Sequence, residues 1–168
     1  IPQRGSEEFH ALYLAGKLLY DGESSRLYQK LVKGAETVLQ LFGFIDERRG
    51  PSAIYIGAIP KEAEDLPEIR QTINDEIKEI SENGVSEIEM RKLRNQLIND
   101  EIRSRQSSMS RAQQIAEFTL YDGNPNLINS QLEDLLKISA EEIKNAVATF
   151  LNTDNHALLD VVPANKEN

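Results

Sequence analysis

Residues 37–60 read TVLQLFGFIDERRGPSAIYIGAIP, and this stretch decides the fold. Residues 37–46 and 52–60 are rich in β-branched, aromatic and aliphatic side chains, which favour strands. Residues 47–51, ERRGP, lie between them and have the composition of a turn. The stretch therefore predicts an antiparallel hairpin.

Both faces of this predicted hairpin are apolar. Along residues 38–45 and 54–59, few polar side chains interrupt either alternating face. A sheet with helices on one side and water on the other should alternate apolar with polar residues. Two interpretations stay open: the strands are buried in the middle of their own domain, or the second face meets a partner.

Helical spacing of apolar residues surrounds the hairpin on both sides. A capping box, Ser86 with Glu89, opens one helix, and a second box, Ser139 with Glu142, opens another. Residues 156–163 have the composition of a last strand. The predicted helices are residues 6–20, a helix capped by Ser24 or Ser25 and ending at Gly34, residues 66–83, one long kinked helix over 86–121, and residues 127–136 and 140–151.

The order of these elements predicts the fold class. Few strands, with helices that do not alternate with them, indicate an α+β domain. We expect a mainly antiparallel sheet with helices packed on one face.

Length and composition restrict the function. A globular chain of 168 residues should bury roughly 70% of the surface that its unfolded form exposes. A net charge of −9 argues against nucleic acid as a partner, and the cluster Arg103, Arg105 and Arg111 shares its helix with carboxylates. No apolar run reaches membrane-spanning length. The absence of cysteine excludes disulfides and thiolate ligands but suits the periplasm and the cytoplasm equally.

Residues able to carry catalysis are scarce. His10 and His156 are the two histidines, and neither stands in an H-x-x-E-H or H-E-x-x-H pair that could chelate zinc. His10 follows Glu7 by one turn, which predicts a surface pair. Residues 22–25, GESS, could receive an anion at a helix N-terminus, although helix capping explains the same residues. We therefore predict no catalytic residue and no metal ligand in this chain.

Four segments carry a resemblance to a known family. Residues 18–31, LLYDGESSRLYQKL, resemble the iLggG-x-SSRLyq-xL signature of the insulinase-like, or pitrilysin-like, zinc metallopeptidases, which include the mitochondrial processing peptidase. Residues 83–89 (NGVSEIE), 136–143 (LKISAEEI) and 158–163 (LLDVVP) resemble later motifs of the same family, in the same order.

This resemblance implies a division of labour between two homologous domains. In the family, the first domain carries H-x-x-E-H and binds zinc, and the second usually lacks these residues. The resemblance implies that residues 1–168 are a single C-terminal, inactive peptidase domain without its first strand, with the catalytic domain and its zinc upstream. Many second domains supply an Arg and a Tyr to the substrate, whereas Val32 and Leu39 occupy those positions here.

Two functions follow from the resemblance. The first is a non-catalytic C-terminal domain of a zinc metalloendopeptidase that forms part of the chamber holding a peptide substrate, beside a homologous catalytic domain or subunit. The second is a structural or assembly subunit of the same family, without proteolytic activity. An H-x-x-E-H motif in the upstream sequence would favour the first function, and its absence would favour the second.

Overall fold

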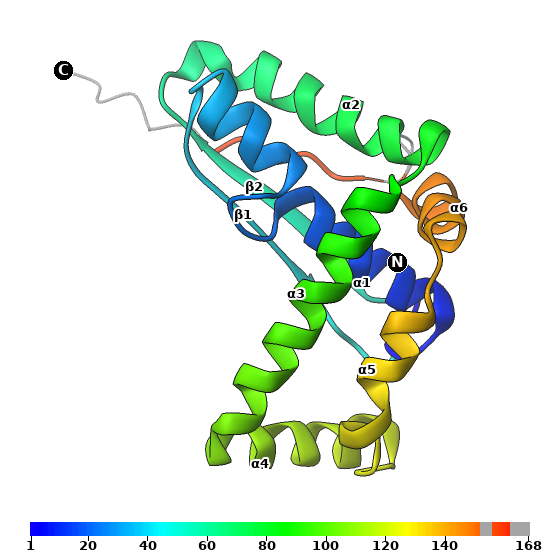
Figure 1. Ribbon diagram of the computed structural model, residues 1–168. Coiled ribbons are helices and arrows are strands. Elements are labelled where there is room, and N and C mark those ends of the chain that lie inside the picture. The colour runs from blue at the N-terminus through cyan, green and yellow to red at the C-terminus, as the bar shows by residue number, and fades with distance from the viewer. Residues whose placement is uncertain (152–155, 162–168) are drawn as a thin grey trace, which may run out of the picture.

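The computed structural model describes residues 1–151 and 156–161 (Figure 1). Two antiparallel strands, β1 (Val38–Asp46) and β2 (Ala53–Pro60), form the sheet, which confirms the predicted hairpin. Phe44 lies opposite Tyr55 and Phe42 opposite Gly57, and a register shift separates Val38 from Gln40. Among the described residues the sheet has these two strands, so the α+β class holds with a small sheet.

Helices, joined by turns and loops, make up most of the rest of the described chain. The helix α1 precedes the hairpin, and α2 to α6 follow it, with short π-helical or 3₁₀ segments between them (Figure 1). Their bounds are α1 Glu7–Tyr20, η1 Tyr28–Gly34, η2 Ala63–Asp65, α2 Leu66–Asn83, α3 Glu87–Gln106, α4 Ser108–Glu117, η3 Phe118–Asp122, α5 Leu127–Lys137 and α6 Ala140–Phe150.

Local chemistry fixes where several helices begin and end. The hydroxyls of Ser86 and Ser139 accept from the third backbone N–H of α3 and α6, and the Glu three residues on returns the contact, which confirms both capping boxes. Pro67 lies in the first turn of α2, where its missing N–H costs nothing. Gly84 ends α2 with φ near 80°, a backbone conformation that other residues rarely adopt.

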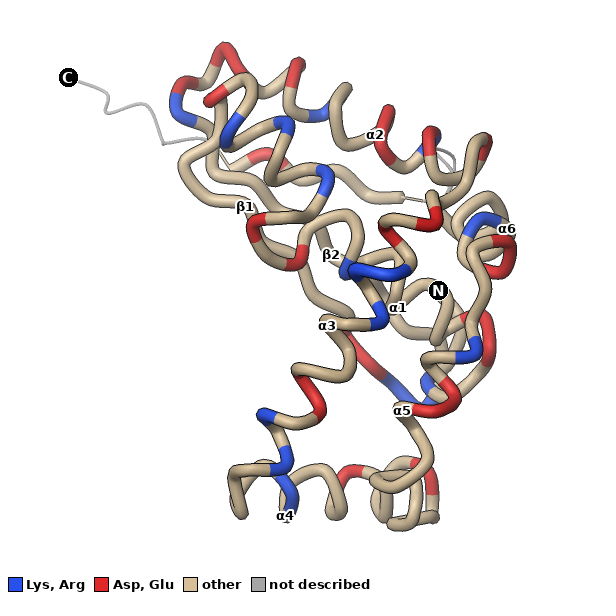
Figure 2. The backbone as a smooth tube through the Cα atoms, viewed as in Figure 1, with Lys and Arg blue, Asp and Glu red and all other residues tan. Residues whose placement is uncertain are grey.

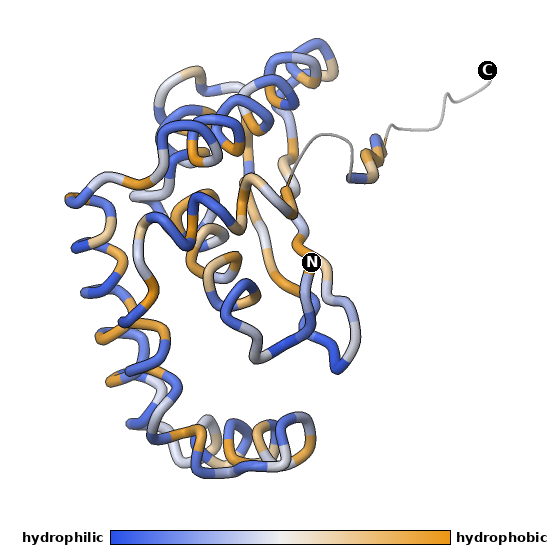
Figure 3. The backbone as a smooth tube through the Cα atoms, turned by 90° about the vertical axis from the view of Figure 1, so that its right-hand side faces the viewer, coloured by the Kyte–Doolittle hydropathy of each residue, from blue (hydrophilic) through white to orange (hydrophobic). Residues whose placement is uncertain are grey.

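The core lies between the hairpin and the helices that cover its inner face. The helix α1 packs on β1, and the ring of Tyr20 lies where a Cβ at Gly43 would collide with it. Figure 3 colours the backbone by hydropathy and shows that hydrophobic residues, in orange, recur along both the helices and the strands. The largest fully buried side chains are Leu12, Leu14, Leu19, Leu27, Leu31, Val38, Ile80, Ile143 and Val147.

The predicted long helix over 86–121 is wrong, because the chain breaks after Gln106. Ser107 adopts an extended backbone, with φ −89° and ψ 122°, and its hydroxyl accepts from the N–H of Ser110. It therefore caps a separate helix, α4, which crosses the far end of α3 (Figure 1). Gly123 ends the following segment in the left-handed conformation, which glycine adopts readily.

The predicted last strand is wrong over its described part. His156–Val161 has no strand pairing in the structure, and Val162 and Pro163 lie outside the described residues. A strand requires a neighbouring strand to bond its backbone, and sequence composition cannot supply one. Leu159 and Val161 are more than four-fifths exposed, so this segment does not alternate between a buried and an open side.

Candidate functional site

The outer face of the hairpin is the candidate site, and five large apolar side chains lie on or beside it. Leu39, Phe42, Phe44, Tyr55 and Ile59 are each 45% to 65% exposed. The rings of Phe44 and Tyr55 stack across the strands, with centroids 4.7 Å apart and an angle of 11° between planes. The Phe42 ring lies over Gly57, where a Cβ would collide with it. We call Phe42, Phe44, Tyr55 and Ile59 the open face, and Leu39 lies beside it.

The two faces of the hairpin differ in burial among the described residues. The opposite face of the hairpin packs Leu41, Ile56 and Ala58 against the core. The open face stays accessible within residues 1–151 and 156–161, so its apolar character is not explained by burial among them. Contiguous exposed apolar groups on a soluble fold mark a contact surface.

The far edge of β2 borders this face. Among the described residues, β2 pairs with β1 alone, so the N–H and C=O groups of alternate residues Ile54, Ile56 and Ala58 point to an unpaired edge. The start of the chain begins to pair there: the Ser52 N–H donates to the Ile1 carbonyl at 3.0 Å, and the Ile1 amino group donates to the Ser52 carbonyl at 2.9 Å. This pairing is antiparallel, because Arg4 N–H donates to the Arg48 carbonyl further along.

The segment after α1 holds the helices together. Ser25, one of the two predicted caps, directly precedes the helical backbone, and its carbonyl accepts from the Gln29 N–H, but its side chain makes no capping bond. The Ser25 hydroxyl is buried and donates to the Gly22 carbonyl at 2.8 Å, which closes a turn before the helix. Gly22 makes this turn possible, because its φ is 79°.

Arg26 is the centre of a network that joins three helical elements. Its guanidinium donates two bonds to the Glu89 carboxylate of α3, at 2.7 and 3.0 Å, and lies 3.6 Å from the Glu76 carboxylate of α2. Lys30 also pairs with Glu76, which is 3% exposed. A carboxylate this buried must be paired, so the network fixes η1 against α2 and α3.

The network also determines protonation. Burial of the Glu89 carboxyl raises its pKa, but hydrogen bonds from Arg26 and Ser86 outweigh burial and lower the pKa to about 2. Burial alone would lower the pKa of Arg26, but its bonds to Glu89 raise that pKa. Both groups are therefore charged at neutral pH and serve structure.

The two histidines do not meet. His10 is half-buried on α1, and its imidazole has no hydrogen bond or ion pair with a described residue. The predicted surface pair with Glu7 is thus absent as a direct contact. Burial lowers the pKa of His10, although the Glu7 charge still acts to raise it. His156 is exposed in the segment after α6. Within the described ranges, no three His, Asp or Glu side chains converge into a group that could hold a metal ion.

The two positions singled out from the resemblance differ in exposure. Val32 is partly buried and packs against the core from η1. Leu39 is 65% exposed, at the register shift in β1 and beside the open face. The family resemblance singled out Leu39 but not the aromatic cluster next to it. The sequence signal for that cluster was the presence of apolar residues on both faces of the strands.

Comparison with protein-family models identifies the chain. Residues 1–97 match the model described as the peptidase M16 inactive domain. The chain belongs to this family. The match covers more than half of the M16 inactive domain described here, from the N-terminus through most of α3. None of the curated proteins compared matches it.

Solved structures share the fold of this M16 inactive domain. The inactive peptidase domain of a "putative zinc protease" from Bordetella parapertussis matches with a TM-score of 0.82 and 21% identity, over 99% of this chain and 90% of the other. A "putative zinc protease" from Bordetella pertussis Tohama I matches with a TM-score of 0.79 and 22% identity, over 98% and 90%. An M16 inactive domain from Pseudomonas fluorescens matches with a TM-score of 0.77 and 18% identity, over 92% of this chain but 37% of the other.

These likenesses bear on the fold and on the size of related proteins. This M16 inactive domain spans most of the two Bordetella chains and about a third of the Pseudomonas chain, which holds further polypeptide. No helix in the described part of the chain is both long and apolar enough to cross a membrane.

Proposed function

We propose that this M16 inactive domain is the non-catalytic C-terminal domain of a zinc metalloendopeptidase, and that its open face forms part of the chamber that holds a peptide substrate. The proposal depends on the open face itself. Two stacked aromatic rings and further apolar side chains are exposed there on a strand surface of a peptidase-family domain. An unfolded peptide presents apolar side chains that such a surface can bind.

The domain would assist catalysis by positioning the substrate, not by supplying a catalytic residue. A zinc peptidase needs a polarised water and a general base, and we assign both to a homologous catalytic domain or subunit. The open face would hold the substrate in place and exclude water from it. In this proposal neither His10 nor His156 takes part in proton transfer.

We place the catalytic domain upstream of residue 1. The antiparallel pairing of Ile1 with Ser52 supports an upstream strand that continues along Ile54, Ile56 and Ala58 and extends the sheet. Such a strand would cover the β2 edge, which otherwise presents unpaired backbone groups. Extending the chain upstream by about six residues, a typical strand, should then raise the melting temperature.

We also propose that this domain does not grip the substrate through the polar pair of its relatives. Val32 and Leu39 stand where the resemblance leads us to expect an Arg and a Tyr, and neither can hydrogen-bond through its side chain. Leu39 would instead add an apolar contact beside the open face, because it is well exposed there. Polar contacts to the substrate would come from another domain or subunit.

Peptide hydrolysis by the longer protein tests the proposal. Phe44→Asp and Tyr55→Asp should lower kcat/KM by about tenfold or more, since each places a charge where apolar substrate groups bind. Ile115→Asp is the matched control, because Ile115 is 43% exposed but lies on α4. Circular dichroism would verify folding of all three variants.

Two results would overturn the proposal in different ways. Equal activity of the Phe44, Tyr55 and Ile115 variants would show that the open face does not bind substrate. A longer protein that hydrolyses no peptide at all would favour the structural or assembly role instead.

A further inference from the structure

The outer face of α3 carries a second apolar stripe. Met90, Leu93 and Leu97 form the buried stripe of this helix. At 100° per residue, the second stripe lies about 140° round the helix from the first, on the exposed side. Five exposed positions recur along it at intervals of three and four residues; three of them are Ile88, Ile98 and Ile102, and the other two are Arg91 and Asn95.

This spacing is that of a helix-packing seam. Apolar residues at alternating steps of three and four form the contact line of paired helices, and a single Asn in such a line specifies register. The stripe extends for about 21 Å, the length of about 14 helical residues. A solvated helix face has no need of three isoleucines at this spacing.

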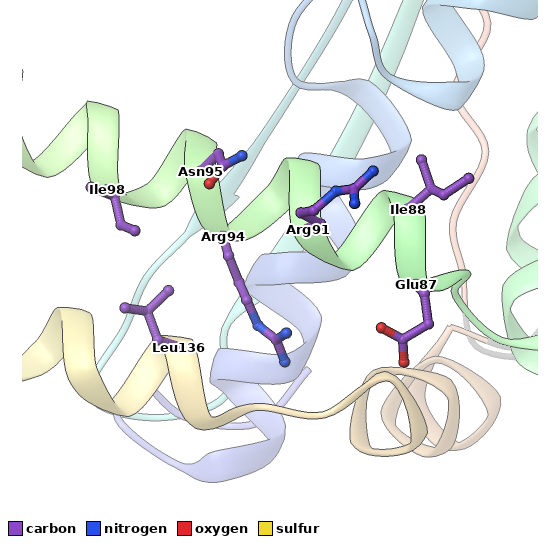
Figure 4. A pocket seen from close by; sticks show the side chains of 7 residues that line it. All are labelled: Glu87, Ile88, Arg91, Arg94, Asn95, Ile98 and Leu136. Atoms are coloured by element: carbon purple, nitrogen blue, oxygen red, sulfur yellow. The ribbon is translucent and has the colours of Figure 1, made fainter.

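A groove accompanies the stripe. A cavity of about 510 Å³ lies between α3 and α5, lined by Ile88, Arg91, Arg94, Ile98 and Leu136 together with Glu87 and Asn95. Figure 4 shows Ile98 and Leu136 facing each other across it, and Arg94 extending from α3 toward the side of α5 and α6. The groove therefore combines apolar walls with a guanidinium.

Two unpaired guanidinium groups line this groove. Arg91 and Arg94 form no hydrogen bond or ion pair with any residue in 1–151 or 156–161, and the same holds for Lys92 and Arg103 on other sides of α3. Most other Lys and Arg side chains that the structure describes are bound to carboxylates. This distribution is unexpected in a chain of net charge −9, where carboxylates outnumber cations, and Figure 2 shows the basic positions along α3.

We infer that the outer face of α3 is a docking surface for an acidic amphipathic helix of a partner protein. The apolar side of that helix packs along Ile88, Ile98 and Ile102, and its flanking carboxylates pair with Arg91 and Arg94. Charge complementarity selects this occupant, because Arg91 within the seam and Arg94 beside it are unpaired, and Glu87 is the one carboxylate among the residues that line the groove. A second copy of this acidic chain and a nucleic acid are the competing occupants.

Two matched peptides test the inference. The probes are fluorescent 15-residue helical peptides with Leu at the seam positions, and either Glu or Lys at all flanking positions. Binding to the full chain is measured by fluorescence anisotropy, and amide shifts in NMR spectra identify the face. The Glu peptide should bind and shift α3 amides, with an affinity at least about tenfold above the Lys peptide.

Variants separate charge from fold. The double variant Arg91→Glu/Arg94→Glu should reverse the preference in favour of the Lys peptide. Ile98→Ser should weaken binding of the Glu peptide, because it removes part of the seam. Lys33→Glu/Lys78→Glu is the control, since it makes the same charge change at two exposed positions, on η1 and α2, and should leave binding unchanged.

Three outcomes would overturn the inference. The first is binding of neither peptide, or of both equally. The second is self-association of the chain in sedimentation that Ile98→Ser abolishes, which would assign the face to a second copy. The third is tighter binding of a mixed-sequence DNA duplex than of the Glu peptide.

Discussion

Replacing Arg26 by Ala should be among the most damaging single changes to this domain. The variant removes two hydrogen bonds to Glu89, at 2.7 and 3.0 Å. It also removes the positive charge that lies beside the carboxylate of Glu76, a residue that is 3% exposed. Breaking a fully buried pair costs about 3–5 kcal/mol, because a charge stays buried without compensation. The side chains of Arg26 and Glu89 are 17% and 26% exposed, and Lys30 still pairs with Glu76, so we expect a smaller loss, about 2 kcal/mol.

Urea unfolding followed by circular dichroism at pH 7 measures this loss. Lys33→Ala is the matched control: its ion pair with Glu23 is 3.3 Å long but exposed, and such pairs contribute roughly 0.5 kcal/mol. A double-mutant cycle with Glu89→Ala should give a coupling free energy of about 1–3 kcal/mol. A loss below about 1 kcal/mol, or additive variants, would refute the role given to Arg26.

The same network predicts a pH dependence. The folded-state pKa of Glu89, about 2, lies below its ordinary value of 4.5, so its stabilising contribution is complete above 4.5 and is lost as the pH falls toward 2. In Arg26→Ala the loss of stability between pH 4.5 and 2 should be smaller, because the guanidinium hydrogen bonds that lower the pKa of Glu89 are gone. Midpoints of urea unfolding, measured between pH 5 and 2 for wild type and variant, test this prediction. If the two midpoints fall in parallel with pH, Arg26 does not lower the pKa of Glu89.

Three further changes have local causes. Gly43→Ala should destabilise the domain by roughly 2 kcal/mol in thermal unfolding, because the new Cβ meets the Tyr20 ring. Gly50→Ala is the control and should change the stability little, because a Cβ there meets no other atom. Ser139→Ala should cost about 1 kcal/mol by removing the cap of α6; an unchanged melting temperature would count against that cap. Burial lowers the pKa of His10, so stability should decline as the pH falls through the ordinary value of 6.5, and His10→Gln should remove that decline.

Local signals in the sequence predicted the elements well. The capping boxes at Ser86 and Ser139 depend on residues three positions apart, so the chain displays them directly. The hairpin likewise follows from two apolar runs around a short turn. The sequence also held a signal for the helix break at Ser107, because Ser is a preferred N-cap. The helical spacing of apolar residues on both sides of Ser107 nevertheless suggested one continuous helix.

Features that depend on distant residues could not be predicted. Arg26 and Glu89 are 63 positions apart, and no sequence spacing joins them. Composition made residues 156–163 look like a strand, but pairing decides whether a strand forms. For the candidate site, the two-sided apolar pattern raised the question of a second contact face, and only the fold shows that Phe42, Phe44 and Tyr55 are exposed together.

Photo-crosslinking tests most directly whether the open face holds substrate. A benzophenone amino acid would replace Phe44 in the longer protein, and in a second sample Leu120, which is 60% exposed but lies on η3 outside the open face. Each sample would be irradiated with a labelled peptide that the longer protein cleaves. We predict that the label is transferred to the protein at position 44 and not at position 120. Cleavage of the peptide without transfer at position 44 would contradict the account.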